Sequence, residues 1–201
     1  MRLEGIHHVT CITGDAPGNV DFYTRVLGLR LVKKTVNQDD PTVYHLFYAD
    51  ERGSPGADIT FFEYPGARSG RAGAGMVHRV TFRVGTEAAL DFWVDRIAAE
   101  GIPPEREGNR VRFDDPEGLG LELAAVDVAD EPLVAEHPEI PSEHRLRGFG
   151  SGVRTRSIWS RIGSKRGGSV SFSPRCSRSS SVAKPGPMVA SSNSTPLGSR
   201  K

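Results

Sequence analysis

The chain has 201 residues, with 26 Lys and Arg against 25 Asp and Glu and a formal net charge of +1, so it is neither strongly basic nor strongly acidic as a whole. No stretch approaches the roughly 18 consecutive apolar residues of a membrane span, and its two cysteines, Cys11 and Cys176, give no disulfide framework. We therefore expect a soluble, cytoplasmic protein without a membrane partner.

The first 65 residues predict the order βαβββ. Strands are expected over residues 6–13, 29–36, 42–48 and 58–64, because apolar and β-branched residues there lie between turn residues. A helix is expected before the second strand, with Asp15 or Asn19 as its N-terminal cap and Gly28 ending it.

The same order returns about 70 residues later, over residues 76–125. Strands are expected at 77–84, around Glu105, at 110–113 and at 119–125, with a helix over 88–100. The helix triplet Asp91-Phe92-Trp93 echoes the triplet Asp21-Phe22-Tyr23. Such a repeat predicts one α+β domain over residues 1–125, in which helices cover one face of each sheet and the sheets curve around a shared cleft.

Composition changes sharply beyond this domain. Residues 126–149 are rich in Pro, Glu and Asp and are predicted to be a solvated linker. The last 51 residues hold ten Lys and Arg, fifteen serines and no acidic residue, so we expect residues 150–201 to be a disordered Ser/Arg-rich tail. This pattern disfavours a basic arm for nucleic acid, because Trp159 and Phe172 are the only aromatic residues of the tail. A further interpretation is that this tail is the translation product of a shifted reading frame.

The alternation of side chains along a strand separates the adjacent residues His7 and His8. In the second unit, Val80 and Phe82 mark the face that packs on the helix. The repeat then places His8 in the cleft and His7 on the packed side, where it would be buried. The alternatives are an exposed strand histidine for His8 and an ordinary core histidine for His7.

Several motifs together resemble the vicinal oxygen chelate superfamily, which includes glyoxalase I, extradiol dioxygenases and bleomycin-resistance proteins. They are the paired βαβββ units, the strand histidines, the Asp-Phe-Tyr triplet and the turn at residues 115–118 before the strand that carries Glu122. The runs at residues 27–41, 44–50 and 53–56 look specifically like hydroquinone-type ring-cleaving dioxygenases. Such proteins contain about twice this βαβββ content, so the chain resembles their N-terminal half, with a frameshift expected shortly after Phe149.

This resemblance implies oxygen-dependent cleavage of a dihydroxylated aromatic ring at non-haem Fe(II), with Mn(II) as the alternative metal. Two histidines and one carboxylate typically hold such a metal and leave positions for substrate and O2. It makes His8 a metal-ligand candidate and His7 a neighbouring group that orients the substrate or relays a proton.

Other candidates complete the site less well. Glu122 faces the cleft by alternation, and His78 could join it and His8 only if a bulge shifted its strand by one residue. The resemblance instead implies that the remaining histidine and carboxylate come from the last βαβββ unit of longer relatives. Thr60, Arg79 and Tyr44 are candidates for lining the substrate cleft.

Two rival functions remain open. A glyoxalase-type lyase is disfavoured, because Thr60 and Arg79 stand where that enzyme places metal ligands and neither is a good one. A metal-free module of the bleomycin-resistance type would instead sequester a planar ligand. An uncovered sheet edge also predicts association, with a homodimer as one form.

Overall fold

The computed structural model describes residues 5–68, 70, 77–150 and 154–155, all within one compact unit, Met1–Gly163. The tail prediction for residues 150–201 lies outside the described residues, except for Gly150 and the two residues of β9 (Arg154–Thr155). The described part of the chain contains no helix that is long and apolar enough to cross a bilayer.

The first βαβββ unit forms a four-stranded sheet with the strand order β1-β4-β3-β2. Its elements are β1 (His8–Thr13), α1 (Ala16–Asp21), a π-helical segment η1 (Phe22–Val26), β2 (Arg30–Val36), β3 (Tyr44–Ala49) and β4 (Asp58–Glu63). β1 and β4 are parallel, and the other neighbours are antiparallel. The predicted order is confirmed, with β1 starting two residues later than expected.

Local signals in the sequence place the first helix. Asp15 is its N-terminal cap, and the Asp15 carboxylate accepts a hydrogen bond from the Gly18 backbone N–H at 3.2 Å. Gly28 follows the last turn with a φ of +70°, a conformation that favours glycine over other residues. The first helical segment therefore begins after the Asp15 cap and ends before Gly28, as the sequence predicts.

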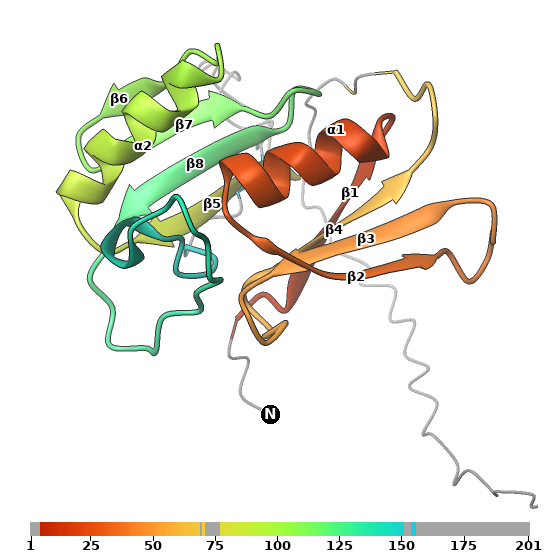
Figure 1. Cartoon of the computed structure of the whole chain (residues 1–201), viewed down its shortest axis with the longest axis horizontal. Helices are drawn as coiled ribbons and strands as arrows, with labels where there is room; N and C mark the ends of the chain where they lie inside the picture. Colours follow the sequence, from red (N-terminus) through yellow and green to blue (C-terminus); the bar gives the residue numbers. More distant parts are fainter. Residues whose placement is uncertain (1–4, 69, 71–76, 151–153, 156–201) are drawn as a thin grey trace, which may run out of the picture. The chain divides into compact units, whose positions relative to one another are not determined.

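The second unit forms a five-stranded sheet with the order β6-β7-β8-β5-β9. Its elements are β5 (Val77–Val84), α2 (Glu87–Ala99), β6 (Glu105–Glu107), β7 (Arg110–Asp114) and β8 (Gly120–Ala125). As in the first unit, the first and last strands of the repeat, β5 and β8, are parallel neighbours. The α+β fold with paired βαβββ units is confirmed, and the ribbon in Figure 1 shows both units.

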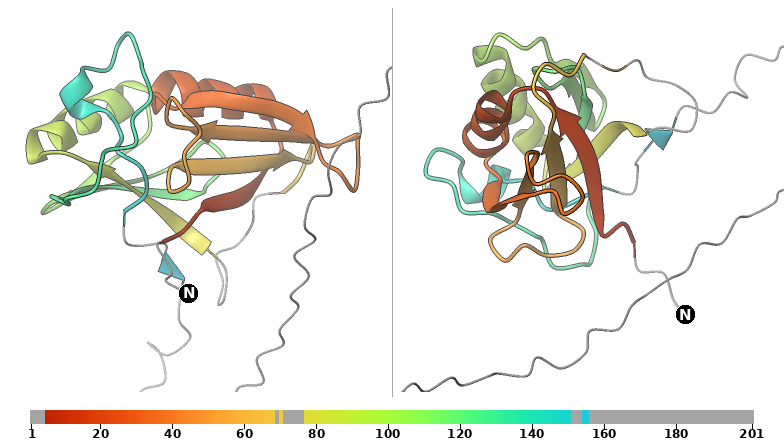
Figure 2. Two further views of the ribbon diagram at one scale, coloured as in Figure 1. Left: turned by 90° about the horizontal axis from the view of Figure 1, so that it is seen from below. Right: turned by 90° about the vertical axis from the view of Figure 1, so that its right-hand side faces the viewer.

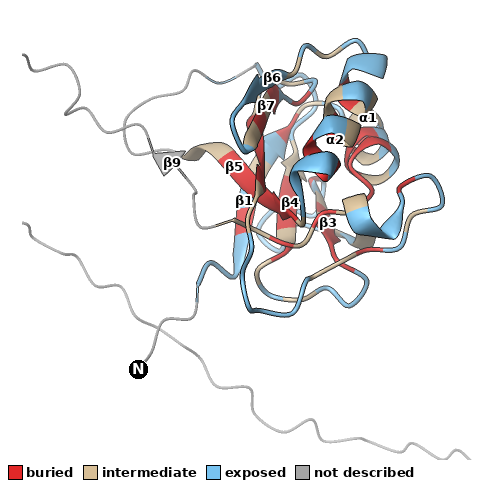
Figure 3. Ribbon diagram, turned by 90° about the vertical axis from the view of Figure 1, so that its left-hand side faces the viewer, coloured by how far each residue is buried: buried red, intermediate tan, exposed pale blue. Residues whose placement is uncertain are grey.

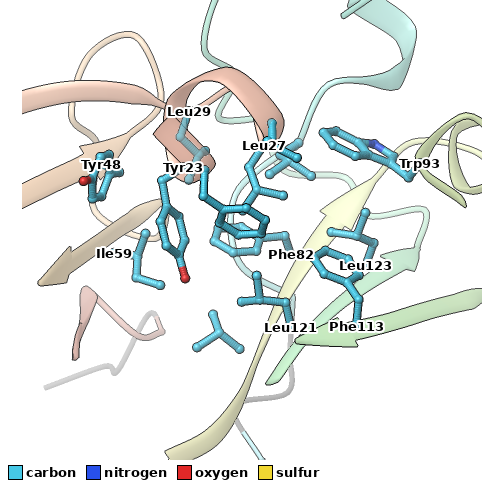
Figure 4. Packing of buried hydrophobic residues seen from close by; sticks show 14 of the residues in the cluster. Tyr23, Leu27, Leu29, Tyr48, Ile59, Phe82, Trp93, Phe113, Leu121 and Leu123 are labelled. Atoms are coloured by element: carbon cyan, nitrogen blue, oxygen red, sulfur yellow. The ribbon is translucent and has the colours of Figure 1, made fainter. Parts of the chain in front are cut away.

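One hydrophobic core joins the two units. Figure 4 shows Tyr23 and Leu27 of the first unit lying between Ile59 of the first sheet and Phe82 of the second. All four side chains are at most 1% exposed. Figure 2 shows the two sheets and their helices from two further sides. The helices therefore cover the inner, apolar face of each sheet, as the alternation predicts.

Polar contacts also tie the units together, at the turn between β7 and β8. The buried Tyr23 hydroxyl donates to the Asp115 carboxylate at 3.0 Å. Glu117 accepts hydrogen bonds from the Thr13 hydroxyl and, at 2.7 Å, from the Gly14 backbone N–H. The turn that follows β7 thus binds the end of β1.

The prediction of a solvated linker over residues 126–149 is wrong. Ile140 and Leu146 belong to the core, at 2% and 3% exposed, and Trp93 donates its indole N–H to the His144 carbonyl at 2.7 Å. A segment rich in Pro and Glu can still pack if a few apolar side chains fill gaps between the units. Composition alone does not reveal those few anchors.

The chain after this segment runs along the free edge of β5. The Gly150 backbone N–H donates to the Thr81 carbonyl at 2.7 Å, and the Arg83 N–H donates to the Gly148 carbonyl at 2.9 Å. β9 then pairs with the start of β5. Along β5 the residues pass from half-buried to fully buried, which Figure 3 shows in colour.

Candidate functional site

The exposed face of β1 is the centre of the candidate site. His8, Thr10 and Ile12 are exposed, whereas Val9 and Thr13 on the other face are buried at 7% and 1%. Ile12 is 61% exposed, an unusual value for a strand isoleucine. The alternation predicted from the repeat is therefore confirmed for β1, with His8 on the face away from the core.

His7 does not lie on the packed side, so the prediction that it is buried is wrong. It precedes the first residue of β1 and is exposed, because strand alternation does not extend to it. Its ring instead meets the ring of His8 edge to face, with centroids 5.3 Å apart. The two Nδ1 atoms lie 3.1 Å apart, so one donates a hydrogen bond to the other.

The neighbouring strand β4 places three side chains beside this face. The parallel register pairs His8 with Asp58, Thr10 with Thr60 and Ile12 with Phe62. The Thr60 hydroxyl donates to the Thr10 hydroxyl at 3.0 Å, which confirms that paired residues touch. Thr60 thus lies beside Thr10 and is buried at 1% exposed, and its place in a substrate cleft stays a prediction.

Sequence reasoning missed Asp58. Its Oδ1 atom is buried and has no hydrogen-bond partner among the residues that the structure describes. Burial raises the pKa of the Asp58 carboxyl, and positive charge on His8 and His7 opposes that rise. A signal was available, because Asp58 stands two residues before Thr60 and so shares its face.

Further aromatic residues of β3 and β4 continue this face. His45 lies between Phe47 and Phe62, with ring centroids 4.0 Å and 3.9 Å away. Its pKa is lowered by burial and by the positive charges of His8 and Lys33. An imidazole held in this way stays neutral at physiological pH.

Tyr44 lies on the opposite face of β3, so its prediction as a cleft residue is wrong. Alternation places it with the core residues Leu46 and Tyr48 rather than with His45. The Lys34 ammonium lies 4.0 Å from the centre of the Tyr44 ring, a cation–π contact at the sheet surface.

Glu122 in β8 is fully buried and already paired. Its carboxylate accepts hydrogen bonds from Arg110 and, at 2.8 Å, from Arg112, and the Thr81 hydroxyl donates to it at 3.2 Å. Burial alone would raise the pKa of Glu122, but the hydrogen bonds from Arg112 and Arg110 outweigh burial and lower it. A carboxylate compensated by two guanidinium groups is poorly placed to bind a metal as well.

The other members of the predicted in-chain triad are not assembled around it. The pairing of β5 with β9 does shift by one residue at His78, whereas the pairing of β5 with β8 stays continuous from Arg79 onward. The described residues contain no group of three or more His, Cys, Asp or Glu side chains that could hold a metal ion. The triad of His8, His78 and Glu122 is therefore wrong for the described chain.

Arg79 lies on the second sheet, on the same face as Thr81 and opposite Gly120. It lines a cavity of about 450 Å³ together with Arg112, Asp114 and Glu105. Its Nε atom is buried without a hydrogen-bond partner among the described residues. The surroundings of Arg79 are thus charged, unlike the aromatic face that carries His8.

Comparison with known proteins identifies the class. Residues 5–123 match the model of the Glyoxalase/Bleomycin resistance protein/Dioxygenase superfamily. The chain belongs to this superfamily, which confirms the resemblance drawn from its motifs. The matched range also agrees with the paired βαβββ units that the structure shows.

Relatives that are named as dioxygenases match most of this chain. MhqA of Bacillus subtilis (strain 168), named as a ring-cleaving dioxygenase, is 42% identical over 160 residues, which cover 75% of this chain and 49% of MhqA. The chlorohydroquinone/hydroquinone 1,2-dioxygenase of Sphingobium indicum is 37% identical over 164 residues, which cover 77% of this chain and 50% of that enzyme. The chain spans about half the length of the curated relatives it matches.

Solved structures agree. A crystal structure of a B. subtilis protein described as a dioxygenase is 44% identical, with a TM-score of 0.67 over 73% of this chain and 48% of that one. A glyoxalase/bleomycin resistance protein/dioxygenase domain from Frankia shares 19% identity and a TM-score of 0.52, covering 63% of this chain and all of that domain. The second similarity shows the fold alone.

Proposed function

We propose that this chain contributes to the active site of a ring-cleaving dioxygenase that acts on a hydroquinone- or catechol-type aromatic compound with O2. The observation that carries the proposal is the exposed His7–His8 pair at the start of β1, in a chain 37–45% identical to named ring-cleaving dioxygenases. We also infer a cytoplasmic location, from the absence of a cysteine framework.

The described residues do not by themselves fit a complete metal site. His8 offers one ring nitrogen, its Nε2, since its Nδ1 faces His7. A metal-binding histidine commonly has its other nitrogen held by a hydrogen bond in this way. We infer that Fe(II), with Mn(II) as the alternative, takes its remaining protein ligands from outside the described residues, and we derive no reaction step through it.

The neighbouring side chains suit an aromatic substrate. Ile12, Phe62 and Phe47 present apolar surface beside His8 on the same sheet face. The Thr10 hydroxyl, two residues from His8, accepts from Thr60 and keeps its own proton available for a substrate oxygen. Thr60 cannot serve as a carboxylate ligand, so a glyoxalase-type lyase has no support at this position.

The test is Fe(II) binding, measured by anaerobic equilibrium dialysis of the full chain, together with O2 uptake in the presence of hydroquinone. We expect His8→Ala to weaken Fe(II) binding at least about tenfold, since it removes a ligand. His137→Ala removes a histidine that lies beside β2, at the opposite edge of this sheet from β1. It serves as the matched control and should leave binding unchanged.

A metal-free chain that binds hydroquinone equally well with and without His8 would contradict the proposal. That result favours a ligand-sequestering module of the bleomycin-resistance type. Light scattering of the same samples tests the inferred homodimer, and a monodisperse monomer at all concentrations overturns that inference.

A further inference from the structure

A groove lies between the first helical segment and the turn after β7, away from the face that carries His8. Phe22 and Val26 of η1 line it together with Ile102, which follows the end of α2, and its volume is about 340 Å³. Pockets for small ligands have volumes of roughly 300–1,000 Å³. The groove is therefore large enough to take one bulky apolar side chain of a binding partner.

The rim of this groove is acidic. Five carboxylates line it, and the one cation among its described lining residues, Arg25, is already paired with Asp21 at 2.8 Å and Glu100 at 2.7 Å. On the opposite wall, burial raises the pKa of the Asp115 carboxyl, and the negative charge of Glu117 adds to that rise. A positively charged partner would relieve this excess of negative charge.

The chain itself carries a segment of the opposite chemistry. Residues 1–150 hold 16 Lys and Arg against 25 Asp and Glu, a formal net charge of −9, whereas residues 151–201 hold ten Lys and Arg and no acidic residue. Within that tail, the run Arg156-Ser157-Ile158-Trp159-Ser160-Arg161 places two large apolar side chains between two arginines. Such a run is complementary to an apolar groove with an acidic rim.

The last described residue lies close to the groove. Thr155 pairs with Val77 at the start of β5. On the other side of β5, the parallel strand β8 begins at Gly120, just after the turn at residues 115–118 that forms one wall of the groove. Two strand spacings come to about 10 Å, and four extended residues span up to roughly 13 Å. Trp159, four residues after Thr155, is therefore within reach of the groove.

We propose that this groove holds Trp159 of the chain's own tail. Ile158 packs beside it, and Arg156 and Arg161 lie over the acidic rim. This segment lies outside the described residues, so the assignment rests on the groove, on the complementary charges and on the short tether. A segment tethered by a few residues has an effective concentration in about the millimolar range, so weak contacts are enough to hold it.

Fluorescence of the full chain tests this contact. Subtracting the spectrum of Trp159→Phe from that of the wild type isolates the emission of Trp159, because Trp93 is common to both chains. At low salt we expect this emission to be blue-shifted and protected from quenching by acrylamide. About 1 M salt should remove much of the protection, because it screens the exposed charges of the rim. Nuclear Overhauser contacts between the Trp159 indole and the Ile102 methyl groups are expected as well.

Two pairs of variants distinguish this groove from general charge attraction. Glu100→Gln removes a carboxylate of the rim, whereas Asp39→Asn removes an exposed carboxylate that does not line the groove. In the tail, Arg161→Ser removes a cation next to the anchor, whereas Arg175→Ser removes one further along. We expect the first member of each pair to increase acrylamide quenching of Trp159 and the second to leave it unchanged. Backbone amide spectra confirm that each variant is folded.

Three results would overturn the proposal. The first is a fully quenched Trp159 at low salt, without contacts to Ile102. The second is an equal response to all four substitutions, which would show attraction spread over the whole surface and no defined groove. The third is protection that rises with protein concentration, since the occupant would then be the tail of a second copy.

Discussion

Cys11 shows how sharply the two faces of β1 differ. It lies one residue from the exposed Thr10 and Ile12, yet it packs against the core. Burial, and secondarily the negative charge of Asp115, raise the pKa of the Cys11 thiol to about 12. The thiolate is the reactive form of cysteine, so this residue is chemically inert near neutral pH.

We predict that Cys11 in the folded chain resists a thiol-specific reagent at about pH 8, close to the pKa of an ordinary cysteine. A Cys176→Ser background leaves Cys11 as the sole thiol. Labelling followed by absorbance should be slow in buffer and fast in guanidinium chloride, where burial is lost. Rapid stoichiometric labelling of the native chain would contradict the burial of Cys11.

Single residues also show where sequence reasoning succeeds and fails. Strand alternation gave the correct face for His8, because the repeat supplied an apolar reference in Val80 and Phe82. It failed for His7, which stands outside the strand, and it could not reveal the pairing of His8 with Asp58. That pairing depends on a parallel register between segments 50 residues apart, which no local pattern encodes.

At the level of elements, the Glu122 carboxylate holds β7 and β8 together. Arg110 and Arg112 of β7 both bind it, and its own side chain is fully buried, whereas the two arginines are 31% and 28% exposed. Removing one member of a buried pair leaves the other uncompensated. We therefore expect Glu122→Gln to lower the free energy of unfolding by about 1–3 kcal/mol at neutral pH.

The effect should depend on pH. The pKa of Glu122 is lower in the folded chain than in the unfolded one, so its ionised form stabilises the fold above about pH 4.3, the ordinary value for Glu. That contribution is lost as the pH falls through the lower, folded-state pKa. Urea unfolding at several pH values should show the wild type and Glu122→Gln converging in acid.

Glu107→Gln is the control for this experiment, since Glu107 pairs with Arg112 but is 71% exposed. An exposed ion pair contributes little, so its removal should change stability by less than about 1 kcal/mol. Equal effects of the two substitutions, or a Glu122 effect that persists unchanged in acid, would show that Glu122 is not held as an ion.

A second element, the turn after β7, fastens the two units to each other. Glu117 accepts from the Thr13 hydroxyl and the Gly14 backbone N–H at the end of β1. Glu117→Ala should therefore lower the free energy of unfolding by about 1–3 kcal/mol, because a partly buried backbone donor loses its charged acceptor. Denaturant unfolding measures this, and Glu105→Ala at the exposed edge strand β6 should cost less than about 0.5 kcal/mol.

At the scale of the whole molecule, the sequence predicts the repeat and its turns but does not predict the packing of residues 126–149. Ile140 stands among Pro and Glu, yet it approaches Gly28 so closely that a Cβ there would lie 2.5 Å from the Ile140 Cδ1 atom. In the sequence alone, the glycine indicates the end of a helix and the isoleucine is an isolated apolar residue in a polar segment. Their contact joins positions more than 100 residues apart, so composition does not predict it.

The shared core makes cooperative unfolding the expected behaviour of this part of the chain. Tyr23, Leu27 and Phe82 come from both units and are buried in one cluster, so neither unit can keep its core intact without the other. Ile59→Val in the first sheet should lower stability by about 1 kcal/mol. Trp93, in the second unit, should report the same shift in a Trp159→Phe background.

The measurement compares Trp93 fluorescence with far-ultraviolet circular dichroism during urea unfolding. If the two units unfold as one, the two probes give coincident transitions, and both transitions shift together in Ile59→Val. The same holds for Val111→Ala, the corresponding variant in the second sheet. Two separate transitions, with Trp93 insensitive to Ile59→Val, would mean that the contacts across the core contribute little, and that each βαβββ unit is stabilised by its own sheet and helix.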